Sequence, residues 1–280
     1  MAVAESIRGT WAIAVYTWRE GIRKKTLLGF LILSIFVIFG STFMTSFMTQ
    51  ATVVGDVETQ VETKMIKDIC VSAISIFGIL ITIFISASVV PTEMDNKVIY
   101  TILSKPLRRY QYLFGKFLGV QLIVIVNLLL MTALFFVALR LKEEVWPTML
   151  LWSALLTYFQ FLIVSSFTFA VSCTSTSSVL PTIAGLFIYI GGNLTEYLND
   201  VSTRKGTSEN AMDEIIGSLA QYLYAVLPNL RLFDLRNQIL NLPLNDPPTD
   251  MAIPNLIAYG LAYAVSGYIL ALLLFYRKEL

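Results

Sequence analysis

Long apolar stretches alternate with short polar segments along the whole chain, and this alternation predicts a helical membrane protein. Because a helix rises about 1.5 Å per residue, roughly 20 apolar residues cross a hydrocarbon core of about 30 Å. Six stretches reach this length, at residues 27–49, 69–90, 117–139, 148–172, 178–198 and 255–276. We therefore expect an all-α polytopic membrane protein with six transmembrane helices.

The first 26 residues follow a different pattern, in which apolar residues recur at helical spacing and charged residues lie off that stripe. The apolar positions are Ile7, Trp11, Ala14, Val15, Trp18 and Ile22. Trp favours the boundary between water and hydrocarbon. Residues 1–26 are therefore predicted to form an amphipathic interface helix, and the alternative is a soluble tail.

The distribution of Lys and Arg among the polar segments predicts the orientation of the chain. With the N-terminus inside, the cytoplasmic segments carry twelve of these residues, and the longer outer segments carry eight. Short cytoplasmic loops of membrane proteins are enriched in positive charge. We therefore expect the N- and C-termini to be cytoplasmic.

Composition supports a membrane protein and excludes several kinds of function. The chain is 56% hydrophobic and 14% charged, whereas soluble domains carry about 25% charged residues. Its net charge of +1 argues against nucleic acid as a partner, because nucleic acid calls for a dense basic surface. The chain has no His, which removes His-based metal sites and His acid–base catalysis.

After the first five stretches, which occupy residues 27–198, the segment 199–254 is too long to be a simple connection. Its pattern predicts an amphipathic helix up to Pro228 and a shorter helical segment before Pro243. Apolar helices outside a membrane need a surface to pack on, so we expect this extracytoplasmic segment to rest on or dip into the outer leaflet. Residues 255–280 then form the sixth transmembrane helix and a cytoplasmic tail.

A polar loop at residues 91–116 separates the second and third stretches and carries five Lys or Arg residues against two acids. Residues 93–103 can continue the preceding helix, and Pro106 ends it because a prolyl nitrogen cannot donate a hydrogen bond. A new helix is predicted from Leu107 onward. The expected product is a helix–break–helix elbow in the cytoplasm, and the alternative is a solvated loop that only follows the positive-inside rule.

The residue order in this loop resembles the loop between the second and third spans of type-two ABC exporter permeases. That family has an acidic residue, a T-L-L-S-x-P turn, an Arg, and then L-L-G-K-x-L-G. The corresponding residues here are Glu93, Thr101, Leu103, Ser104, Pro106, Arg108, Leu113, Gly115, Lys116 and Gly119. The plan of the whole chain and its Leu227-Pro228 pair also resemble this family, and the nitrous-oxide-reductase maturation permeases share the size and plan.

The resemblance implies a subunit that dimerises with a second permease copy or a paralogue and docks cytoplasmic ABC ATPase subunits. A coupling helix in the loop would pass closure of the ATPases to the spans. The resemblance assigns this role to Glu93, Asp95, Lys97, Thr101, Ser104, Pro106, Arg108, Arg109, Gly115 and Lys116. Of these, Glu93, Arg108 and Arg109 are expected to project toward the ATPase. The turn 173–178 corresponds to a second coupling helix.

The chain has no nucleotide-binding loop of the form G-x-x-x-x-G-K-[ST]. We therefore expect no enzymatic activity and no cofactor on this chain, with ATP and Mg²⁺ bound by the partner ATPase. The spans carry few polar residues, and the candidates for a translocation path are Gln121, Asn127, Gln160, Asn193 and Glu196. For the first three we favour hydrogen bonding between helices.

The patterns predict a multi-pass membrane protein, and the resemblance implies a permease in the cytoplasmic (inner) membrane of a bacterium or archaeon. Its expected function is export of a hydrophobic or amphiphilic substrate, or transmission of force across the membrane, driven by the separate ATPase. The alternative is a scaffold without transport that anchors or matures an extracytoplasmic protein complex. The predicted partners are therefore the ATPase, a second permease, membrane lipid and an extracytoplasmic protein.

Overall fold

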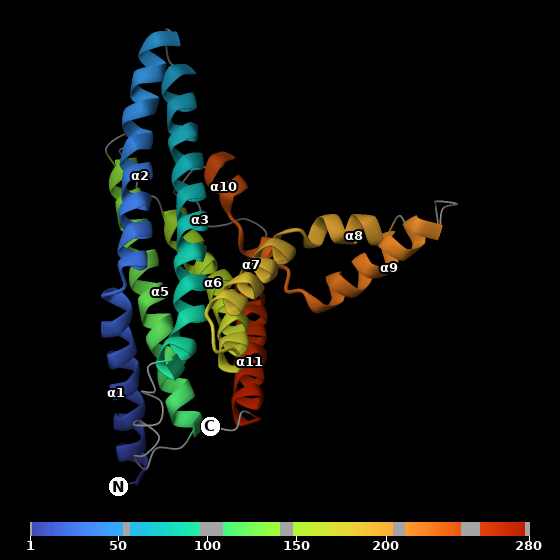
Figure 1. The fold of residues 1–280 in the computed structure, drawn as a ribbon. Coiled ribbons are helices and arrows are strands. Elements are labelled where there is room, and N and C mark those ends of the chain that lie inside the picture. Colours follow the sequence, from blue (N-terminus) through green and yellow to red (C-terminus); the bar gives the residue numbers. More distant parts are fainter. Residues whose placement is uncertain are drawn as a thin grey trace.

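The computed structural model describes residues 2–52, 57–95, 109–140, 148–203, 211–241 and 253–277, and the regular elements in these ranges are helices (Figure 1). They are, in chain order, α1 (Ala2–Ile22), α2 (Lys25–Thr52), α3 (Val57–Asp95), α5 (Arg109–Arg140), α6 (Thr148–Thr174), α7 (Val179–Asn193), α8 (Thr195–Thr203), α9 (Ala211–Val226), the 3₁₀ helix η1 (Leu230–Phe233), α10 (Arg236–Asn241) and α11 (Ile253–Tyr276). The predicted all-α class is confirmed for this part of the chain.

Among the described residues, four helices are long and apolar enough to cross a membrane. They are Lys64–Asp95 in α3, Arg109–Arg140, Met149–Thr174 in α6 and Ile253–Tyr276. Two shorter apolar helices, Leu28–Ser41 in α2 and Val179–Asn193, correspond to the first and fifth predicted stretches. Six complete crossings therefore stay a prediction.

The fifth predicted stretch, 178–198, is longer than the helix that forms there. α7 ends at Asn193 after 15 residues, a length of about 22 Å against a hydrocarbon core of about 30 Å. Gly191 and Gly192 weaken its last turn. Their missing side chains also make room for the segment after α9, because a Cβ at Gly192 would lie 2.6 Å from Cγ of Leu230.

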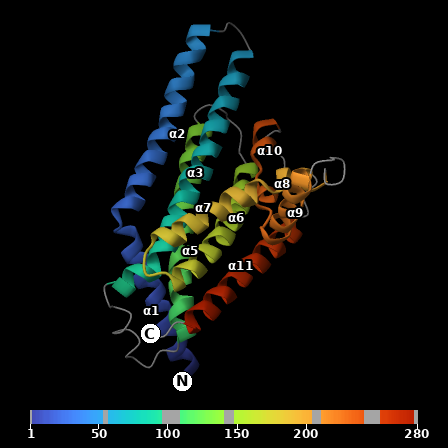
Figure 2. The same ribbon diagram turned by 45° about the vertical axis from the view of Figure 1, so that its right-hand side comes forward.

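The central helix of the bundle is α6, which packs against α3, α5, α7 and α11 (Figure 2). α2 lies against α3, and the two extend together beyond the upper ends of α5 and α6 (Figure 1). The start of α1 and the end of α11 lie at the same end of the bundle. An even number of crossings produces this arrangement, and the cytoplasmic location of both ends stays a prediction.

The amphipathic N-terminal segment forms α1, which runs lengthwise along the first half of α5 (Figure 1). The face of α1 buried against the bundle carries Ile13, Ala14 and Thr17, whereas Trp11 from the predicted apolar stripe is 57% exposed. The buried face is therefore rotated from the predicted one. Ile13, Ala14 and Thr17 face α5, and Trp11 stays exposed on the other side of α1.

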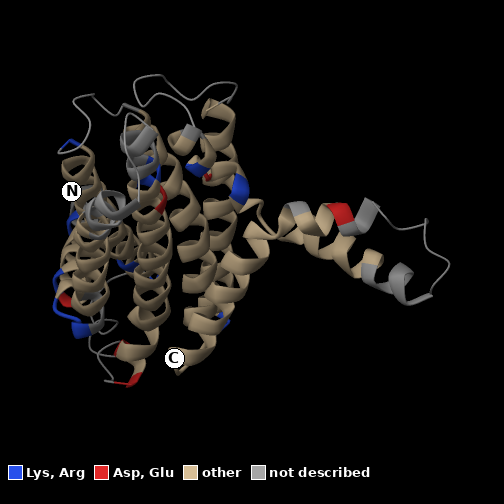
Figure 3. Ribbon diagram, turned by 90° about the horizontal axis from the view of Figure 1, so that it is seen from above, with Lys and Arg blue, Asp and Glu red and all other residues tan. Residues whose placement is uncertain are grey.

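The segment between α7 and α11 has two parts. α8 and α9 pair as a hairpin that projects to one side of the bundle (Figure 3). η1 and α10 return to the bundle, where Nε of Arg236 donates to Oδ1 of Asp68 on α3 at 2.7 Å. The hydroxyl of Tyr259 on α11 accepts a hydrogen bond from the amide of Asn229 at 2.9 Å. The Leu227-Pro228 pair therefore belongs to a turn that docks on the bundle.

Candidate functional site

The loop that resembles a coupling element joins the end of α3 to the start of α5. Five of its predicted coupling residues, Lys97, Thr101, Ser104, Pro106 and Arg108, lie outside the described residues. The structure describes the two roots of the loop, where the other five lie: Glu93, Asp95, Arg109, Gly115 and Lys116. These roots make up the candidate site.

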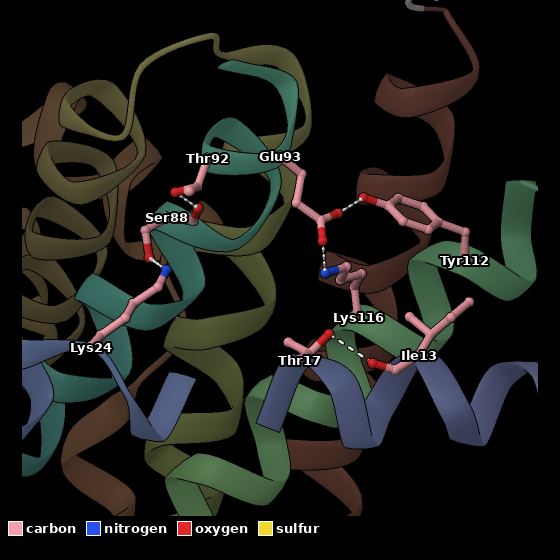
Figure 4. Close-up of polar contacts among 8 residues, drawn as sticks. All are labelled: Ile13, Thr17, Lys24, Ser88, Thr92, Glu93, Tyr112 and Lys116. Carbon is pink, nitrogen blue, oxygen red and sulfur yellow. Dashed lines mark hydrogen bonds and ion pairs between the residues drawn. The ribbon is translucent and has the colours of Figure 1, made fainter. Parts of the chain in front are cut away.

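A buried ion pair joins the two roots. Nζ of Lys116, on α5, donates to Oε1 of Glu93 near the end of α3, and the hydroxyl of Tyr112 donates to Oε2 of the same carboxylate (Figure 4). Glu93 is 3% exposed, and Lys116 and Tyr112 are fully buried. Both carboxylate oxygens are thus satisfied. We call Glu93, Tyr112 and Lys116 the root cluster.

The prediction that Glu93 projects toward a partner is wrong, because its side chain points inward to Lys116 and Tyr112 (Figure 4). A carboxylate that leaves water for a protein interior needs a counter-charge and hydrogen-bond donors. The root cluster supplies both. Glu93 and Lys116 therefore lie inside the bundle, next to the two ends of the loop.

A proline, Pro91, lies inside α3 close to Glu93. It is buried, two residues before Glu93. A proline within a helix removes one backbone hydrogen bond and clashes with the preceding turn, which kinks the helix. The last turns of α3 bend away from the axis of its main part (Figure 2). The side chain of Glu93, two residues beyond Pro91, lies against Tyr112 and Lys116 of α5.

Two glycines of the family-like motif hold α1 against α5. A Cβ at Gly115 would lie 2.7 Å from the carbonyl oxygen of Thr10, and a Cβ at Gly119 would lie 2.5 Å from Cβ of Thr17. Contacts this short exclude any larger residue unless α1 moves. Gly115 and Gly119 therefore form the floor of a groove that receives α1.

Aromatic rings bring two further helices to the root cluster. Nζ of Lys116 lies 5.2 Å from the ring centroid of Tyr16 on α1, within the range of a cation–π interaction. The ring of Tyr112 stacks on Phe275 near the end of α11, with centroids 6.0 Å apart. The cluster thus connects α1, α3, α5 and α11 at one end of the bundle.

Lys24, between α1 and α2, makes a second contact with the end of α3. Its Nζ donates to Oγ of Ser88 at 2.9 Å (Figure 4). Burial lowers the pKa of Lys24 below its ordinary value, and the charge of Glu20 opposes that shift. Lys24 ties the chain between α1 and α2 to α3.

The remaining described coupling residues lie at the surface of the roots. Asp95 is exposed at the last position of α3, and Arg109 is half-buried at the first position of α5. These two residues flank the loop, and their contact with a partner stays a prediction. The structure therefore divides the predicted coupling set into an inner part, Glu93, Gly115 and Lys116, and an outer part.

The described candidate path residues make hydrogen bonds between neighbouring helices and within one helix. Nε2 of Gln121 on α5 donates to Oγ of Ser165 on α6 at 2.7 Å, and Nδ2 of Asn127 donates to the carbonyl of Ile123 at 3.1 Å. Nε2 of Gln160 on α6 lies 3.5 Å from Oδ1 of Asn193 on α7. The contacts of Gln121 and Gln160 join neighbouring helices, as polar contacts in membrane proteins do, whereas the contact of Asn127 stays within α5. The side chain of the fifth candidate, Glu196 on α8, lies outside the described residues.

Sequence reasoning missed three contributors to the site, Tyr16, Lys24 and Tyr112. The spacing of Tyr112 and Lys116 contained a usable signal, because residues four apart on a helix share a face. The sequence contained no such signal for Tyr16 and Lys24, because their contacts depend on how α1 packs against α3 and α5. Their contacts follow from packing and not from local pattern.

The whole plan of the chain matches one protein family. The family described as "ABC-2 family transporter protein" matches residues 11–280 of the 280-residue chain. A comparison with curated proteins gave no match. The matched range contains both roots of the loop and all four helices long enough to cross a membrane. The resemblance seen in the loop is thereby confirmed, and the chain belongs to the ABC-2 family of transporter proteins.

Proposed function

We propose that this ABC-2 family permease couples ATP hydrolysis on a separate ATPase subunit to movement of its own helices. The observation that carries the proposal is the root cluster, which joins both roots of the 96–108 loop inside the bundle. A partner that pushes on the loop acts on two helices that are tied together. A force on the loop is then passed to the helices of the bundle.

The buried ion pair between Glu93 and Lys116 is strong enough to transmit a force from the loop. Opening a buried ion pair by removing one partner costs about 3–5 kcal/mol. Glu93 and Lys116 meet this description, being 3% and 0% exposed. α1 follows α5 because Gly115 and Gly119 leave no space between the two helices. Displacement of the loop therefore moves α1, α3 and α5 as one unit.

A second permease copy is the proposed partner of the α8–α9 hairpin. Tyr197, Tyr222 and Val226 on this hairpin are 66%, 74% and 75% exposed. Large exposed apolar groups mark contacts with protein or membrane. The hairpin projects from one side of the bundle (Figure 3), where a second copy would approach it. Dimerisation by this side would cover these residues.

The proposed substrate is hydrophobic or amphiphilic. Residues 69–92 of α3 and 117–139 of α5 contain no charged residue, and neither α6 nor α11 contains one. An ion or proton path through a membrane requires ionisable groups at depth. Export of an apolar substrate, or transmission of force without transport through the chain, fits these helices. Family membership gives no support to the non-transporting scaffold.

Purification of the tagged chain in mild detergent from membranes of its own host tests the proposal. We expect an ABC ATPase subunit to accompany it, and we expect light scattering to give a mass that contains two permease copies. Replacement of Arg108 and Arg109 together by Ala should weaken ATPase recovery. Lys64→Ala, an exposed cation at the other end of α3, is the matched control. Repeated isolation of the folded chain without an ATPase would overturn the proposal.

A further inference from the structure

A small polar pocket lies where α3, α5 and α6 meet, in the half of the bundle away from the root cluster. Its cavity volume is about 10 Å³. Ser75 of α3 and Ser153 and Thr157 of α6 line it with hydroxyl groups, and Thr132 lines it from α5. Along α5, Thr132 lies 16 residues beyond Lys116, a distance of about 24 Å.

The hydroxyls of this pocket differ from the other described hydroxyls of α3 and α6. Those others donate to backbone carbonyl oxygens three or four residues earlier, a bond that a helix offers to any Ser or Thr. They are Ser72, Thr82, Ser86, Ser88 and Thr92 on α3, and Ser165, Ser166, Thr168, Ser172 and Thr174 on α6. Ser75, Ser153 and Thr157 make no hydrogen bond to another residue in the part of the chain that the structure describes. Their hydroxyls are therefore left for another partner.

Ser153 shows why these hydroxyls need a partner. It is 9% exposed, and it lies on Met149–Thr174, a helix long and apolar enough to cross a membrane. Burying a hydroxyl without a hydrogen-bond partner destabilises a fold. The hydrocarbon around a transmembrane helix supplies neither donors nor acceptors. A partner for Ser153 therefore has to lie in the pocket itself.

The size and charge of the pocket select its ligand. A cavity of about 10 Å³ matches one water molecule, which needs about 10–15 Å³ and two to four polar partners. A hard cation calls for more oxygen ligands, with carboxylates among them. The described residues that line the pocket carry no charge, so a cation would stay uncompensated there. Thr132 is not counted among the ligands, because its hydroxyl oxygen is fully covered in the described structure.

We propose that the pocket binds one water molecule, held by the hydroxyls of Ser75, Ser153 and Thr157. Water and hydroxyl groups can each donate and accept, so the three partners are satisfied together. A bridging water links two groups almost as well as a direct hydrogen bond. α3 is then joined to α5 by an ion pair at one end of the bundle and to α6 by a water molecule in the other half. The inference is independent of ATPase coupling and therefore of the proposed function.

Radiolytic labelling of the full chain in phospholipid nanodiscs tests this site. A brief X-ray pulse splits bound water into hydroxyl radicals, which oxidise the side chains beside it. Phe135 lines the pocket and is 0% exposed, and Phe169, which does not line it, is equally buried. We therefore expect tandem mass spectrometry to find several-fold more oxidation on Phe135 than on Phe169. Equal oxidation of the two rings would overturn the proposal.

Two variants separate a ligand of the water from a hydroxyl outside the ligand set. Ser153→Ala removes one partner of the water, so oxidation of Phe135 should fall to the level of Phe169 and the Tm should drop by a few degrees. Thr132→Val removes an unpartnered hydroxyl, so it should leave the oxidation unchanged and keep or raise the Tm. A Tm raised by Ser153→Ala contradicts the proposal, because this hydroxyl would then lack a partner. A Tm raised by Na⁺ in place of choline, and only with Ser153 present, would also contradict it, because a cation would then occupy the pocket.

Discussion

The root cluster makes a quantitative prediction about the stability of the bundle. Glu93→Gln removes the negative charge but keeps the size of the side chain, which leaves the ammonium of Lys116 buried beside a neutral amide. Lys116→Met leaves the carboxylate of Glu93 with only the Tyr112 hydroxyl as partner. Because both groups are almost fully buried, we expect each single change to cost about 3–5 kcal/mol.

The double variant Glu93→Gln/Lys116→Met should recover most of this loss. It contains no buried charge, and the amide oxygen of Gln can still accept from Tyr112. Replacing both partners of a buried ion pair by groups of similar volume is often neutral. The two single effects should therefore be strongly non-additive, as expected for residues in direct contact.

Thermal unfolding of the purified chain in one detergent measures these effects. For a chain of this size, about 1 kcal/mol corresponds to roughly 2–4 °C in Tm, so each single variant should lose about 6–20 °C. The Tm of the double variant should lie close to that of the wild type, and the double variant should bind the ATPase as the wild type does. Single variants with wild-type Tm, or a double variant as unstable as the singles, would refute the role assigned to the ion pair.

Three further predictions concern packing, surface charge and topology. Gly119→Ala should destabilise the chain by about 1–3 kcal/mol because its Cβ would overlap α1, whereas Gly29→Ala, with open space around it, should be neutral or stabilising by up to about 1 kcal/mol; equal effects in thermal unfolding would contradict the groove for α1. Arg236→Gln breaks an ion pair whose partners are each 42% exposed, so we expect a loss below about 1 kcal/mol, and a loss in Tm as large as that of Gly119→Ala would show that α10 depends on this pair. Single cysteines at Ser104 and Ser208, in a background without the two native cysteines, should react with impermeant reagents from opposite sides of the membrane. Labelling of position 104 from outside intact cells would reverse the predicted orientation.

The local sequence pattern was enough to predict most of the helices and the family of this protein. Long apolar runs predicted the helices that the structure describes, because apolar length is what a hydrocarbon core demands of a helix. Among the described residues, four of the six runs form helices long enough to cross a membrane. The residue order of the loop identified the family, and the missing nucleotide-binding loop placed ATP on another subunit as a prediction.

Only the tertiary structure decided which side chains of those helices are buried and which charges are paired. Residue order marked Glu93, Gly115 and Lys116 as a surface for a partner, but in the folded bundle the side chain of Glu93 is buried against Lys116. The buried face of α1 likewise depends on Gly119, which offers space to Thr17 and not to Trp11. Periodicity along one helix shows which faces are apolar. Which face is buried, and whether a charge is paired, depends on the shape and charge that a distant segment brings to it.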